Sequence, residues 1–486
     1  MKKHVSRWCA RLLALVMVMS LAACGSGDTQ QTIPQADNGD NVAATSGNAE
    51  AGGEEKEWYG NPDGTPVTLK FYAAIQPEYG YAEMVNNFNA EFADKGIQLE
   101  YVRYVNNADG NMEIDTYLTA GGTIDVLVTY TATNYLLNRY QSGLLYNMTD
   151  LLQEYGFDVD KEMGSIAMGS YYMEGDQVYG IPSTFSNNRW MLVNVDMFEA
   201  AGVEVPYDGW TYEEFLTACE KLTKGEGAEK TYGMMWCWNT NSSMALQLIS
   251  APLGQFGTYA SADGSAPNFD APVWNDGLTM MKTSMDEGWA YSAEQEIADS
   301  LTFQNTFLAG KCAISMNVSQ LRLVLDTATY PHDFKTAMVP GPVPDESYLT
   351  DEYRYNNGAT LVASDLMTVA ADTKHPEACV QFVLWYLRGG MTPVATYGRI
   401  PLWSGYDYGT ITDALAASGD ILDLVSMMTF MSVDKNSFVS ALSFDTDSKI
   451  DTALKEEITA VLLGKQSVEE GLANAKTRGD GFINSN

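Results

Sequence analysis

The chain has 486 residues, 45% of them hydrophobic and 19% charged, which supplies enough apolar material for about two or three domains. It carries 63 Asp and Glu against 28 Lys and Arg, a formal net charge of −35. An acidic body of this kind repels nucleic acid phosphates and anionic lipid, so the composition argues against nucleic-acid binding and against membrane attachment through a basic patch.

Residues 1–23 have the pattern of a secretory signal peptide. Four basic side chains precede an apolar run at 12–19 that is too short to span a bilayer. Leu21-Ala22-Ala23-Cys24 then resembles the lipobox of bacterial lipoproteins, in which the cysteine sulfur receives a diacylglyceryl group. The resemblance implies an anchor at Cys24, because two or more acyl chains hold a protein stably on a membrane.

Residues 24–57 are predicted to be the lipidated cysteine and a flexible linker. From residue 25 on they are rich in Gly, Ser, Asn, Gln, Ala and acidic residues, and they contain no aromatic side chain. Such a segment cannot bury a core, and its typical reach is about 30 Å.

Strand and helix patterns alternate after the linker. Residues 67–73, 97–105 and 124–129 have strand patterns, and apolar side chains at helical spacing lie between them at 82–92 and 114–118. This alternation predicts an α/β fold with helices on the faces of a sheet. Further strands are expected at 232–235, 312–316 and 360–363, and helices at 376–387, 412–433 and 448–463.

Cysteine and histidine usage offers little material for catalysis or metal binding. Cys9 and Cys24 belong to the predicted export signal. The body of the chain keeps four widely spaced cysteines, with no CxxC pair, and only two histidines, neither beside an obvious nucleophile. We expect no enzyme activity, no cofactor and no metal site. Buried free thiols are favoured for Cys219, Cys237, Cys312 and Cys379, with disulfides left open.

A series of short motifs resembles the family 1 extracellular solute-binding proteins of ABC importers, the group that includes maltose-binding protein. The motifs follow the family order over nearly all of residues 66–465: GDQVYGIP at 175–182, VNVDMFEAAG at 193–202, WTYEEF at 210–215, FLAGKCAI at 307–314, MVPGP at 338–342 and KHPEA at 374–378. Two segments depart from the pattern, 207–209 before Trp210 and the loop Gly398-Arg399-Ile400-Pro401. The second departure weakens site assignments near Arg399.

The resemblance implies a two-lobed periplasmic-binding-protein-like fold of type II, with lobes joined by a hinge. We place the first lobe at 66–180 plus 313–370 and the second at 181–312 plus 371–486. The resemblance further implies a monomer on the extracellular face of the bacterial cell membrane. It would capture a small solute between the lobes and deliver it to the permease subunits of an ABC importer.

Family 1 proteins mostly carry sugars, whose sites combine aromatic faces with polar side chains that bond hydroxyl groups. Ligands of open α/β sheets lie beyond the carboxyl ends of the strands. The candidates that follow are Trp236, Trp238, Asn239, Tyr130, Asn317, Trp403, Arg399 and Glu78.

Each candidate has an alternative role. The tryptophans and Tyr130 could be core residues, the asparagines could stabilise turns, Arg399 could pair with an internal carboxylate, and Glu78 could be a solvated loop charge. Two other functions also stay open: the same fold with a peptide, an amino-acid derivative or another polar solute, and an exported glycoside-acting enzyme. The enzyme would need two carboxylates at a fixed separation, and no stretch singles out such a pair.

Overall fold

The computed structural model describes most of the chain after residue 64. The described residues are 65–130, 133–163, 177–187, 189–253, 259, 266–350, 361–417, 419–431 and 444–484. The predicted signal peptide, the predicted lipidation site Cys24 and the predicted linker lie outside these ranges. Within them, no helix is long and apolar enough to cross a membrane.

The first sheet has five strands in the order β2-β1-β3-β9-β4. They are β2 (Ile97–Arg103), β1 (Val67–Ala73), β3 (Val126–Thr129), β9 (Leu361–Val369) and β4 (Ile181–Asn187). β1, β2 and β3 run parallel, so their carboxyl ends meet at one edge, and β9 runs antiparallel to both β3 and β4. This sheet with the helices that pack on it is called the first lobe.

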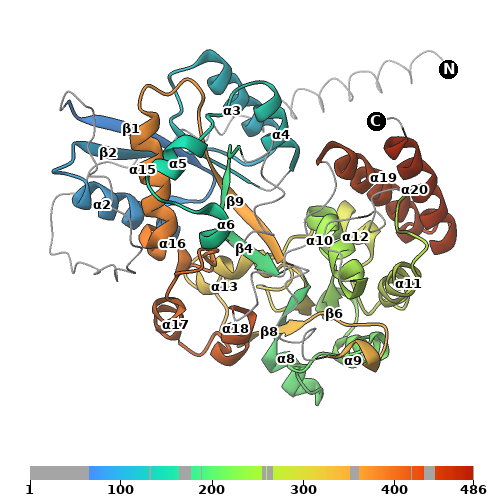
Figure 1. The fold of residues 1–486 in the computed structure, drawn as a ribbon. Helices are drawn as coiled ribbons and strands as arrows, with labels where there is room; N and C mark the ends of the chain where they lie inside the picture. The colour runs from blue at the N-terminus through green and yellow to red at the C-terminus, as the bar shows by residue number, and fades with distance from the viewer. Residues whose placement is uncertain are drawn as a thin grey trace, which may run out of the picture.

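Helices cover both faces of the first sheet. On one face, Phe71 of β1 meets Phe382 of α15 (Pro376–Trp385) edge to face, with ring centroids 4.9 Å apart. Phe88 of α2 (Ala82–Glu91) packs against the same Phe382 ring. On the other face, α3 (Ala108–Ala120) contributes to a smaller apolar cluster. Figure 1 shows α15 beside β1, although about 300 residues separate them in the chain.

The second sheet has four strands in the order β6-β7-β5-β8. They are β6 (Tyr232–Met235), β7 (Cys312–Ser315), β5 (Trp190–Asn194) and β8 (Thr336–Pro340). β6 and β7 are parallel, whereas β5 is antiparallel to β7 and to β8. This sheet and its helices form the second lobe.

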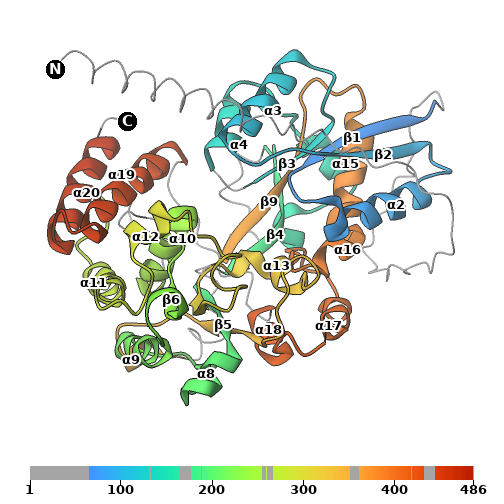
Figure 2. The same ribbon diagram turned by 180° about the vertical axis from the view of Figure 1, so that it is seen from behind.

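Among the described residues, six helices pack in the second lobe in addition to α8 (Val195–Ala201) and α18 (Leu424–Met431), which contact β7 and β8, respectively. Figure 2 shows the α19–α20 hairpin beside α11 and α10. The six are α9 (Tyr212–Leu222), α10 (Trp238–Ser250), α11 (Pro272–Asp286), α12 (Ala293–Ala298), α19 (Phe444–Leu462) and α20 (Val468–Ile483).

Shorter elements connect these parts. They are η1 (Pro77–Tyr81), α4 (Thr133–Gln141), α5 (Thr149–Glu154), α6 (Val159–Met163), α8 (Val195–Ala201), η2 (Gly227–Glu229), η3 (Ala251–Leu253), η4 (Val318–Gln320), α13 (Leu321–Leu325), η5 (Glu346–Tyr348), η7 (Tyr386–Gly390), α16 (Thr392–Ala395), α17 (Tyr408–Ala416) and α18 (Leu424–Met431).

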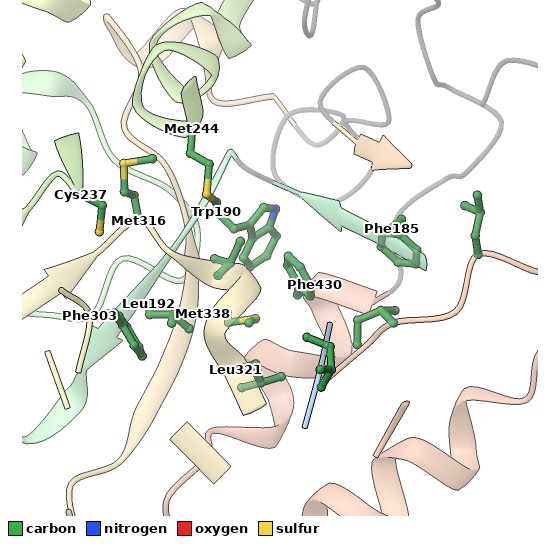
Figure 3. Close-up of a cluster of buried hydrophobic side chains, with 14 of the residues drawn as sticks. Phe185, Trp190, Leu192, Cys237, Met244, Phe303, Met316, Leu321, Met338 and Phe430 are labelled. Atoms are coloured by element: carbon green, nitrogen blue, oxygen red, sulfur yellow. The ribbon is translucent and has the colours of Figure 1, made fainter. Parts of the chain in front are cut away.

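The chain passes between the sheets from β4 to β5 and again from β8 to β9. A buried cluster fills this junction, where Trp190 of β5 meets Phe430 of α18 edge to face at 5.6 Å (Figure 3). Trp190 is 1% exposed, so its side chain is shielded from water at this junction.

Strand pairing differs from the expected division of the chain in three places. β4 belongs to the first sheet, so residues 181–187 do not start the second lobe. β7 and β8 belong to the second sheet, so residues 312–340 do not extend the first sheet. Conversely, α15 and α16 pack on first-lobe elements rather than on the second lobe. Sequence order did not reveal these exchanges, because both sheets combine strands that lie far apart along the chain.

All four described cysteines, Cys219, Cys237, Cys312 and Cys379, are buried free thiols. This agrees with the favoured expectation. Burial raises the pKa of Cys237 to about 12, which makes its thiolate scarce at neutral pH.

Candidate functional site

Two residues predicted from the sequence, Tyr130 after a strand and Arg399 in a loop, come together at the carboxyl edge of the first sheet. Tyr130 directly follows β3, and the guanidinium carbon of Arg399 lies 5.9 Å from the centroid of its ring. The Tyr130 hydroxyl accepts a hydrogen bond from the Ala74 backbone N–H at 2.9 Å. The end of β1 therefore fixes the ring that follows β3.

Arg399 is paired with a carboxylate that the sequence analysis missed. Its Nη1 lies 3.1 Å from Oδ2 of Asp365, whose side chain is only 2% exposed. Burial alone would lower the pKa of Arg399, but Asp365 and then Tyr130 raise it above its ordinary value. The guanidinium thus stays charged in a largely buried setting, and the internal-pair alternative for Arg399 is correct.

Asp365 occupies an unusual backbone position. It lies in the middle of β9 with φ of +52°, in the left-handed region where non-glycine residues carry strain. The Ser183 hydroxyl donates to its carbonyl at 2.8 Å, which ties β9 to β4 at this point. A charged residue inside the apolar segment LVASDLMTV was the sequence signal for this position.

Arg322 brings a second guanidinium to the site from the connection between β7 and β8. It lies on α13, where Leu321 packs beside Gly398 so closely that a Cβ on that glycine would lie 2.9 Å from it. Gly398 has φ of +85°, so glycine is required there for conformation as well as for space. Gly398 therefore lets α13 pack beside the loop that carries Arg399.

Tyrosines complete the site. Tyr81 stacks on Tyr101 with centroids 5.1 Å apart, and the Tyr101 hydroxyl donates to the Ile75 carbonyl. Tyr104 follows β2, and its hydroxyl donates to the Val128 carbonyl at 3.0 Å. Tyr79 of η1 donates to Oδ2 of Asp326 at 2.7 Å. The tyrosine–arginine cluster is defined as Tyr79, Tyr81, Tyr101, Tyr104, Tyr130, Arg322, Asp365 and Arg399.

The two expected tryptophans of the second lobe are structural in this arrangement. Trp236 is fully buried, and its Nε1 donates to the Ser284 hydroxyl at 2.9 Å. Trp238 is 3% exposed and donates to Thr459 on α19. They do not share one strand face, because β6 ends at Met235, Cys237 turns the chain with φ of +54°, and α10 begins at Trp238.

Three further candidates are held by local contacts or lie in solvent. Asn317 is buried and accepts a hydrogen bond from the Ser319 hydroxyl, as expected of a turn residue. Asn239 is exposed at the start of α10, and its backbone N–H donates to Glu296. Glu78 is exposed on η1, as expected of a solvated loop charge.

Trp403 belongs to a separate group in the first lobe. Its indole N–H donates to Glu162 at 3.0 Å, and Glu162 also forms a two-pronged ion pair with Arg388. This indole is half-buried and fixed against α6. The structure therefore does not join it to the tyrosine–arginine cluster.

A pocket of about 490 Å³ lies elsewhere, between α9 and α11 of the second lobe. Tyr212, Glu220, Asp276, Thr283 and Trp289 are among its lining residues. None of its lining residues belongs to the tyrosine–arginine cluster or to the set predicted from sequence. No group of His, Cys, Asp or Glu side chains in the described ranges could hold a metal ion.

A comparison with protein families decides the class of this chain. Residues 72–388 match the family described as bacterial extracellular solute-binding protein. The chain belongs to this family. Its members are non-catalytic transport receptors, so the expectation of a protein without enzyme activity is confirmed. No curated protein sequence matches the chain.

Solved structures share the fold at low sequence identity. A sugar transporter of Rhizobium etli in an open conformation is 19% identical, with a TM-score of 0.62, over 85% of this chain and 99% of that one. A substrate-binding protein of Listeria monocytogenes in complex with cycloalternan is 17% identical, with a TM-score of 0.63, over 86% and 99%. UgpB of Mycobacterium tuberculosis in complex with glycerophosphocholine is 16% identical, with a TM-score of 0.64, over 86% and 99%. These similarities confirm the two-sheet α/β fold of the periplasmic-binding-protein type.

Proposed function

We propose that this protein captures a carbohydrate between its two lobes and delivers it to an ABC importer. The observation that carries the proposal is the tyrosine–arginine cluster, where phenol rings and guanidinium groups gather at the carboxyl ends of β1, β2 and β3. Aromatic faces pack on the C–H surfaces of sugar rings, and polar groups beside them orient hydroxyls. The printed descriptions of related structures include a sugar transporter and complexes with cycloalternan and D-mannitol.

Groups reached from both sheets lie beside one another at the tyrosine–arginine cluster. α13, reached from the second sheet, carries Arg322 and is followed by Asp326, which accepts a hydrogen bond from Tyr79 of the first lobe. A solute that touches groups of both lobes favours the closed arrangement, because it gains more contacts there than in the open one.

Fluorescence tests the binding step. Trp190 lies buried at the junction of the lobes, so closure is expected to change its environment and with it the emission of the protein. We expect a saturable change with at least one member of a panel of mono- and oligosaccharides, without release of product. Saturation only with amino acids or peptides would instead favour the non-sugar alternative.

We further propose that Cys24 anchors the mature chain to the outer face of the membrane. The lipobox-like segment 21–24 and the linker to residue 57 support this, since the anchored body needs reach to meet a permease. In cells fed a clickable fatty acid, the wild type is expected to carry the label and the variant Cys24→Ser to lack it. An unlabelled wild type would contradict the anchor.

A further inference from the structure

Arg322 is a partly buried cation without a carboxylate partner among the residues that the structure describes. Its Nη1 donates a single bond, 3.3 Å long, to the Ser319 carbonyl. Its Nε is buried and has no hydrogen-bond partner. A guanidinium offers five N–H donors, so most of the hydrogen-bonding capacity of Arg322 is unused by the protein.

The neighbouring carboxylates are committed elsewhere. Asp365 pairs with Arg399. Asp326, four residues after Arg322, accepts from the Tyr79 hydroxyl and from the Thr329 backbone N–H at 3.0 Å, and it forms no ion pair with Arg322. Burial opposes ionisation of Asp326, but the bond from Tyr79 lowers its pKa, so this carboxylate is already stabilised.

Electrostatics make the unpaired state costly. Burial, and next the positive charge of Arg399, lower the pKa of Arg322 to about 10. The group remains charged at neutral pH. The charge of Asp365 offsets part of the cost of its burial, but Asp365 is paired with Arg399, so Arg322 has no counter-ion of its own among the described residues. An anion placed beside it would offset the rest of that cost.

We infer that Arg322 receives an anionic group of the ligand, so the captured carbohydrate carries a carboxylate or a phosphate. A planar guanidinium binds either group through paired N–H···O bonds, which a neutral hydroxyl cannot match. Tyr79 and Tyr130 contribute aromatic surface beside this charge. The inference rests on the proposed function, and it identifies an acidic solute for a protein whose overall charge is strongly negative.

Matched sugars test the inference by calorimetry with the full mature protein. Glucose, glucuronate and glucose 6-phosphate differ only at C6, and the corresponding galactose set varies the ring. We expect an acidic member to bind at least about tenfold more tightly than its neutral parent, a difference well within the strength of one charge-assisted pair. The uronate and phosphate arms distinguish the two anions.

Variants of Arg322 test whether this residue causes the preference for acidic sugars. Arg322→Gln is expected to reduce the preference for the acidic sugar to about threefold or less, and Arg322→Lys to restore part of it. Arg478→Gln is the matched control, because this arginine lies on α20 and pairs with Glu456 and Glu457 far along the chain from the site. Thermal melts of the unliganded variants verify that each one folds.

The outcomes separate the two proposals. Equal binding of neutral and acidic sugars overturns the inference and leaves carbohydrate capture intact. An acidic preference that survives in Arg322→Gln also overturns it, because another group must then supply the charge. Binding by neutral oligosaccharides of the wider panel alone also overturns the inference. No binding by either set or by that panel contradicts both proposals.

Discussion

At the residue scale, the structure brings together some of the residues predicted from sequence and separates others. Tyr130 and Arg399 were identified because one follows a strand and the other lies in a family-like loop, and the structure brings them together. Trp236 and Trp238 were chosen as aromatic residues, yet both fill the second-lobe core. Asp365 and Arg322 were missed, because their role depends on contacts between segments that lie more than 30 residues apart.

Removing one partner of the Arg399–Asp365 ion pair is expected to destabilise the folded protein. Asp365→Asn keeps a side chain that tolerates positive φ but leaves Arg399 buried without its counter-ion. Breaking a buried pair in this way is expected to lower the free energy of unfolding by about 3 kcal/mol, measured by urea denaturation. The control Asp286→Asn breaks the exposed pair with Lys282 and is expected to cost under about 1 kcal/mol. Equal effects would contradict the role given to Asp365.

Glu296 is expected to make the stability of the fold depend on pH. It is fully buried against the start of α10, and burial raises its pKa to about 7 despite hydrogen bonds from the backbone N–H groups of residues such as Asn239. The folded state therefore holds this proton more tightly than the unfolded state does. The resulting stabilisation is complete below pH 4.5 and is lost as the pH rises through 7.

Glu296→Gln mimics the protonated carboxyl and therefore avoids the loss of stability as the pH rises through 7. Above pH 7 the variant is expected to be more stable than the wild type by up to about 3 kcal/mol, with the difference vanishing towards pH 4.5. Thermal or urea unfolding across that range measures it. Glu294→Gln, an exposed position on the same helix, should leave the pH profile unchanged. A Glu296→Gln profile parallel to the wild type would refute the assignment.

At the element scale, alternation and helical spacing predicted most of the regular structure. The strand expected at 67–73 coincides with β1, and the strand expected at 232–235 coincides with β6. The helix expected over 412–433 is instead two helices, α17 and α18. Gly419, with φ of +84°, lies between them and turns the chain, which apolar spacing alone could not reveal.

Packing of β6 against α9 gives a prediction at this scale. A Cβ at Gly233 would lie 2.5 Å from the Cys219 carbonyl oxygen and 2.6 Å from its Cα, so backbone must move to admit it. We expect Gly233→Ala to destabilise the protein by about 2 kcal/mol or more in urea denaturation. Gly481→Ala has open space on helix α20 and is expected to stabilise by about 0.5–1 kcal/mol. A neutral Gly233→Ala would contradict the close approach.

At the scale of the whole molecule, the family motifs predicted two lobes but not which segments build each one. Motifs are local, whereas membership of a sheet depends on pairing between distant strands. Along the chain, β7 and β8 of the second sheet come before β9 of the first sheet. α15 follows β9 and packs on the first sheet (Figures 1 and 2). This interleaving brings Arg322, Asp365 and Arg399 together although the chain visits the second lobe between them and Tyr130.

Calorimetric titration of the wild type and of Tyr130→Ala with the carbohydrate that gives the strongest fluorescence change tests the central claim most directly. If the solute is held at the tyrosine–arginine cluster, removing this ring weakens binding by at least about tenfold, or about 1.4 kcal/mol, while the control Trp403→Phe binds within about twofold of the wild type. Unchanged affinity in Tyr130→Ala, with the variant folded, would contradict the account and move the binding site to another part of the molecule.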